Sequence, residues 1–124
     1  MFGLFGLFGK SRQLVALESE LREAGVHPRL VHDAVKLTVL RLLPDGGKAA
    51  RPDELRNAAE LLAYCILGPH DFANATTVRT RDAVERRLDA VLDHPQSLDA
   101  QIVMLALKTD SADPAVAERF EVEE

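Results

Sequence analysis

Cysteine, aromatic residues and long apolar runs are all scarce in this sequence of 124 residues. The single cysteine, Cys65, excludes a disulfide framework and a cysteine-rich zinc site within one chain. One thiol is also typical of a reducing compartment, so we expect a cytoplasmic protein. No stretch approaches the roughly 20 consecutive apolar residues that span a bilayer, which predicts that the chain has no transmembrane segment.

Positive charge is also in deficit, because 15 lysines and arginines face 20 acidic residues and the formal net charge is −5. Phosphate contacts supply most of the affinity for nucleic acid, so this balance predicts no nucleic-acid partner. One basic cluster alternates with acids at helical contact spacings, with Asp82 and Arg86 as an expected pair. It is typical of a solvent-exposed face crossed by ion pairs, and its members are Arg79, Arg81, Arg86 and Arg87.

Apolar residues at three- and four-residue spacing are abundant, in segments separated by Pro and Gly. They predict helices between Ser11 and Gly25, over residues 28–43, 52–67 and 80–94, and from Ser97 to about residue 107, with a short turn after Asp113. Residues 68–79 show no clean period, although Phe72 is expected to anchor this connection to the core. We therefore expect an all-α fold, a single compact bundle of about five helices over residues 11–120, between a flexible apolar tail (1–10) and an acidic end (121–124).

The segment 28–43 is apolar around most of its helical circumference, so we expect it to be the central helix. The segment 97–107 contains six consecutive apolar residues, 102–107, and is similarly rich in apolar surface. So much apolar helix surface in a small domain predicts self-association, most simply as a two-fold homodimer. The expected core residues are Leu37, Leu40, Leu62, Ile66, Leu88, Val103 and Leu105.

Motifs for chemistry are weak. Gly46-Gly47-Lys48 lacks the preceding glycine and the following Ser or Thr of a phosphate-binding loop, so we expect no nucleotide or other cofactor. Cys65 lies on an apolar helix side without a neighbouring base, which favours a structural thiol. The most site-like pair is His70-Asp71, because loops on rigid scaffolds often carry function. A small enzyme or metal-binding protein that uses this pair, with His32 or His94 beside it, is therefore an alternative.

The most biased segment is Phe2 to Gly9, a repeated Phe-Gly-Leu triplet (FGLFGLFG). A period of three drifts around a helix and three glycines destabilise it, so we expect no isolated helix here. Its apolar side chains are expected to contact a partner's groove or a membrane interface, against the alternatives that the segment is disordered or packs on its own core. These candidate contact residues are Phe2, Leu4, Phe5, Leu7 and Phe8.

The leading hypothesis from the sequence is a non-catalytic helical module that binds another protein or itself. Weak chemical motifs and two helices with wide apolar surfaces both favour it. Peripheral membrane association through FGLFGLFG is the other alternative to the enzyme hypothesis.

Overall fold

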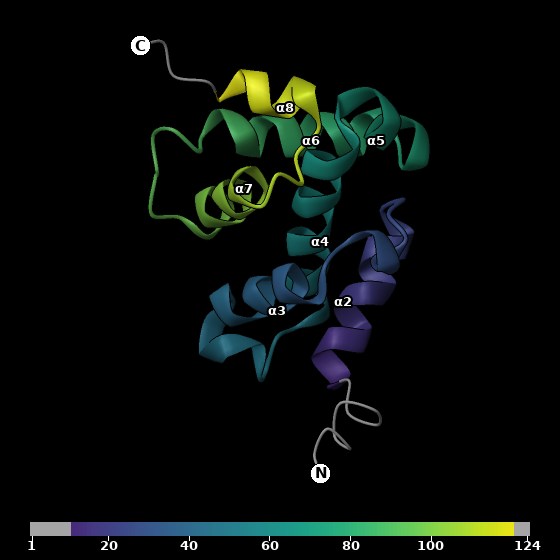
Figure 1. Cartoon of the computed structure of the whole chain (residues 1–124), viewed down its shortest axis with the longest axis vertical. Helices are drawn as coiled ribbons and strands as arrows, with labels where there is room; N and C mark the ends of the chain where they lie inside the picture. Colours follow the sequence, from purple (N-terminus) through teal and green to yellow (C-terminus); the bar gives the residue numbers. More distant parts are fainter. Residues whose placement is uncertain (1–10, 121–124) are drawn as a thin grey trace.

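The chain is all-helical in the part that the computed structural model describes, residues 11–120 (Figure 1). Within these residues there are seven α-helices, two short 3₁₀ turns and no strand, which confirms the predicted fold class but not the number of five helices. The helices are α2 (Arg12–Glu23), α3 (Asp33–Leu42), α4 (Pro52–Leu67), α5 (Pro69–Ala75), α6 (Val78–Asp89), α7 (Leu98–Lys108) and α8 (Pro114–Arg119), and the 3₁₀ turns are η1 (Pro28–Leu30) and η2 (Pro44–Gly47).

Side-chain caps begin three of the helices where the sequence predicted a start. The Ser11 hydroxyl accepts a hydrogen bond from the Leu14 N–H at 3.1 Å, and the Ser97 hydroxyl accepts one from the Ala100 N–H at 3.1 Å. Asp113 caps α8 in the same way. Each cap satisfies an N–H group that has no partner within the helix, so these starts are determined locally.

Gly25 ends α2 in the left-handed conformation, with φ +97°. The Val26 N–H donates to the Leu21 carbonyl at 2.9 Å, which closes the end of the helix. A Cβ atom at position 25 would lie 2.3 Å from the Cβ of Ala75, so glycine also permits α5 to approach here. The predicted C-cap is therefore confirmed, and a close helix contact adds to its requirement for glycine.

The central helix is α4, and the prediction that segment 28–43 takes this place is wrong. Helix α4 contacts α2, α5, α6 and α7, and most of its circumference is buried (Figure 1). The segment 28–43 instead divides into η1 and α3, because Val31 is extended and His32 does not adopt helical backbone angles. Three buried alanines on α4 allow the neighbouring helices to approach it from several sides. These alanines are Ala58, Ala59 and Ala63.

The segment predicted to be irregular, residues 68–79, contains the seven-residue helix α5. Gly68 has φ +85° and separates α5 from α4, and Pro69 occupies the first turn of α5. Phe72 is completely buried, as predicted. Helix α6 begins at Val78 rather than at Thr80, because the Thr77 hydroxyl caps it, and it ends at Asp89 rather than at His94.

The predicted core is mostly confirmed. Four of its residues are buried, namely Leu40, Leu62, Leu88 and Val103, and two more, Ile66 and Leu105, are half-buried against them. Leu37 is the exception, since it is 39% exposed on α3. None of the helices in residues 11–120 combines the length and the apolarity needed to cross a bilayer.

Candidate interaction surface

The buried side of α3 includes a lysine that pairs with other parts of the chain. Lys36 is buried, and its Nζ lies 2.6 Å from Glu18 Oε2 and 3.1 Å from the Pro28 carbonyl oxygen. It also pairs with Asp33 at 3.2 Å. The buried side of α3 thus consists of Val35, Lys36, Val39 and Leu40. A helix that turns this side inward exposes the residues between them, which explains why Leu37 is not in the core.

Helix α7 also exposes an apolar side chain next to its buried face. Ile102, Val103 and Ala106 are buried, whereas Met104 is 47% exposed and Leu105 is half-buried. Six consecutive apolar residues cannot all face one core on a helix with 3.6 residues per turn. Part of this run must therefore face outward.

Helices α3 and α7 are in contact (Figure 1). Residues of both helices line a groove of about 350 Å³. Four of its seven lining residues are apolar and three are polar, and protein interfaces combine apolar and polar side chains in a similar way. Leu37 is exposed on the same helix as two of the lining residues. We call the surface formed by the groove-lining residues the α3–α7 face. These residues are Thr38, Leu42, Pro95, Gln101, Met104, Leu105 and Lys108.

A larger and more polar cavity, of about 490 Å³, lies against α2, α4 and the start of α6. Glu20 pairs with Arg56 at 3.5 Å. Burial raises the pKa of Glu60, and the nearby Arg87 and Arg56 partly oppose this effect. The sequence did not predict this cavity, because the residues that line it are dispersed along the chain. The lining residues are Ser19, Glu20, Glu23, Ala24, Arg56, Glu60, Thr76 and Thr80.

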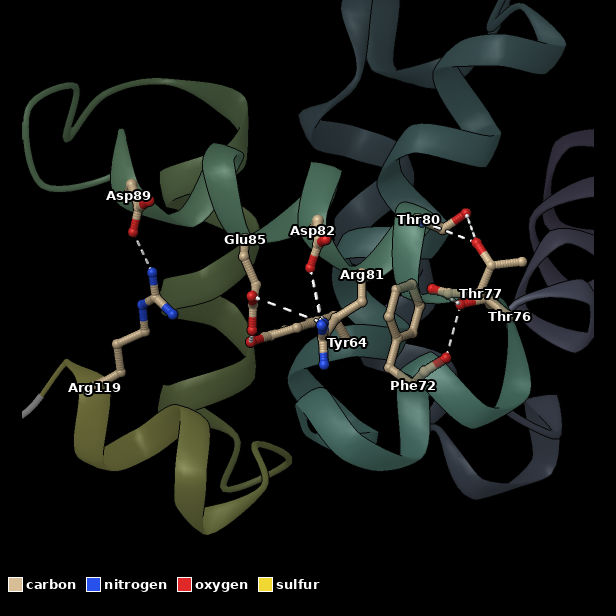
Figure 2. A network of polar contacts seen from close by, with 10 residues as sticks. All are labelled: Tyr64, Phe72, Thr76, Thr77, Thr80, Arg81, Asp82, Glu85, Asp89 and Arg119. Carbon is tan, nitrogen blue, oxygen red and sulfur yellow. Dashed lines mark hydrogen bonds and ion pairs between the residues drawn. The ribbon is translucent and has the colours of Figure 1, made fainter.

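A network of polar contacts attaches α6 and α8 to the rest of the molecule (Figure 2). The Tyr64 hydroxyl donates to Glu85 Oε2 at 2.7 Å, and the Tyr64 ring meets the Phe72 ring edge-to-face at 5.6 Å. Burial, followed by the hydrogen bond to Glu85, raises the pKa of Tyr64. Arg119 on α8 forms an ion pair with Asp89 on α6. These contacts hold helices together and leave the phenol inaccessible.

Two arginines of the predicted basic cluster are engaged in ion pairs. Arg87 makes two hydrogen bonds to the Asp99 carboxylate, at 2.8 and 3.0 Å. Arg81 pairs with Asp82 at 3.0 Å, so the partner of Asp82 is its neighbour rather than Arg86 as predicted. Such pairing with acids supports the interpretation of an ion-paired helix face.

The candidate catalytic pair lies on the surface at the start of α5. His70 and Asp71 are exposed, and the His70 ring contacts the Asn74 side chain one turn further along, at 3.3 Å. Neither residue is among those that line the two cavities described above. In the described residues, no group of three or more His, Cys, Asp or Glu is placed to hold a metal ion. The hypothesis of a His70-Asp71 site thus gains no structural support.

Cys65 is completely buried in α4, as a structural thiol would be. Burial raises the pKa of this thiol to about 12, so the reactive thiolate is nearly absent at neutral pH. Its backbone carbonyl accepts a hydrogen bond from the Asp113 N–H at 2.7 Å, which joins the end of α4 to the start of α8. The contribution of Cys65 is thus to packing.

The apolar residues predicted to contact a partner or membrane, Phe2, Leu4, Phe5, Leu7 and Phe8, lie outside the described residues. The α3–α7 face therefore carries the structural argument for an interaction. A scan against protein-family models and searches of curated proteins and of solved structures found nothing that matches this chain.

Proposed function

We propose that this protein is a helical module that acts through protein–protein contacts, and that its α3–α7 face binds the same face of a second copy. The observation that carries the proposal is the 47% exposure of Met104 in a groove whose lining also includes the apolar residues Leu42, Pro95 and Leu105. Contact of this apolar lining with water is unfavourable, and association removes it.

A second copy suits this surface because a two-fold axis through it covers the apolar lining of both copies at once. Met104 is 47% exposed in this lining, which it shares with Leu42, Pro95 and Leu105. One patch then supplies both halves of the contact. The polar lining residues Gln101 and Lys108 are exposed, and they keep their contact with water at the border of the proposed interface.

Cross-linking tests where the copies meet. Gln101→Cys places a reactive thiol at an exposed position that lines the groove, whereas the native Cys65 is buried and does not compete. We expect a short bismaleimide to link this variant into covalent dimers. Val78→Cys is the matched control, because Val78 is exposed at the start of α6, outside the α3–α7 face. Equal dimer yields from the two variants would contradict the proposed face.

A further inference from the structure

A second apolar groove lies at the base of α2 and α4, away from the α3–α7 face. Its volume is about 290 Å³, and two of its lining residues, Ala16 and Ala50, carry only methyl groups, which leave the groove open. Gln13 Nε2 donates to the Lys48 carbonyl oxygen at 2.6 Å, which holds the link before α4 against α2 and forms one wall. The groove is lined by Arg12, Gln13, Ala16, Ala50, Pro52 and Leu55.

An apolar segment of the sequence directly precedes the residues that line this groove. Ser11 is the N-cap of α2, and the next two residues, Arg12 and Gln13, already line the groove. The ten residues before Ser11 include FGLFGLFG, the most biased segment of the sequence. Ten extended residues span at most about 33 Å, which is ample to return along α2.

We propose that residues 2–8 dock in the groove between the first turns of α2 and α4 of their own chain, with their Phe and Leu side chains over Ala16 and Leu55. A short tether gives such a segment an effective concentration on the order of millimolar. A second copy or another partner at micromolar concentration competes poorly with it. The sequence left open a partner's groove, a membrane interface, disorder and the chain's own core for this segment, and the proposal selects the chain's own surface. The proposal does not depend on the α3–α7 dimer.

The absence of tryptophan from the chain makes the proposal directly measurable. Phe5→Trp introduces the only indole, in the middle of the segment. In the full-length variant we expect a blue-shifted emission that does not change with protein concentration. By NMR, we expect contacts from the indole at position 5 to the methyl groups of Ala16 and Leu55.

Two matched variants show whether the groove is responsible. Ala16→Glu, combined with Phe5→Trp, places a charge in the groove and should shift the emission to the red. Ala115→Glu is the control, because Ala115 is exposed in the first turn of α8, at the opposite end of the molecule from the start of α2 (Figure 1). Circular dichroism verifies that each variant is folded, and Ala50→Glu replaces Ala16→Glu if the latter is not.

Three results would overturn the proposal. The first is an emission typical of a water-exposed indole in the parent variant. The second is a blue-shifted emission that the groove variants leave unchanged, together with no NMR contact to Ala16 or Leu55, since the segment then packs elsewhere. The third is a blue shift that appears only as protein concentration rises, because the occupant is then the segment of a second copy.

Discussion

Truncation of Met104 tests the proposed dimer, because this side chain is half-exposed in the groove of the α3–α7 face. Met104 is 47% exposed on α7, so about half of its surface is free for a partner. Alanine is the best helix former and preserves the backbone of α7. We therefore expect Met104→Ala to leave the secondary structure intact and to weaken association.

The size of the effect follows from the exposed fraction. Complete burial of a methionine side chain contributes about 1.5 to 3 kcal/mol, so burial of the exposed 47% contributes about 0.7 to 1.4 kcal/mol. A two-fold dimer contains this contact twice, which doubles the contribution to about 1.4 to 2.8 kcal/mol. The dissociation constant of Met104→Ala should consequently rise about 10- to 100-fold.

Sedimentation equilibrium measures this change directly. The wild-type protein should self-associate at tens of micromolar, an order-of-magnitude range for weak dimers, and Met104→Ala should be largely monomeric there. Val78→Ala is the matched control, since Val78 is 57% exposed on α6 and its truncation should not alter the dissociation constant. A wild-type monomer at these concentrations, or equal dissociation constants for the wild type and Met104→Ala, would refute the reasoning.

Three further predictions concern the stability and chemistry of the fold. Gly25→Ala should lower the free energy of unfolding, measured in urea, by more than the roughly 1 to 2 kcal/mol that a left-handed alanine costs, because its Cβ meets Ala75. Gly46→Ala is the control, since Gly46 also has a positive φ but has no atom within 4 Å, so this variant should lose only that amount. Equal losses in the two variants would contradict the close contact at Gly25. The raised pKa of Tyr64 means that its contribution to stability is complete below the unfolded value of 10.0 and is lost as pH rises above it. Tyr64→Phe should flatten this alkaline decline in urea titrations, whereas tyrosinate absorbance near pH 10 without unfolding would argue against a raised pKa. Cys65 should resist an aromatic disulfide reagent at pH 8 until urea unfolds the chain, and rapid reaction of the folded protein would show that the thiol is accessible.

Local signals in the sequence were sufficient for most of the helix boundaries. The hydroxyls of Ser11 and Ser97 and the left-handed Gly25 act within a few residues of their own positions, so their effects can be predicted without knowing the fold. Helix α5 was missed because seven residues are too few to establish a period. Its anchor, Phe72, was nevertheless identified from its size and position.

Tertiary contacts decided the direction in which α3 faces, and with it the candidate interaction surface. The sequence of 28–43 is apolar on nearly all sides, so its periodicity does not select one buried face. The buried face combines Val35, Val39 and Leu40 with Lys36, which pairs with Glu18, 18 residues earlier, and Leu37 stays in contact with water. The sequence by itself determined an all-α chain with surplus apolar surface. Where that surplus lies depends on pairings between distant residues, which only the folded chain brings together.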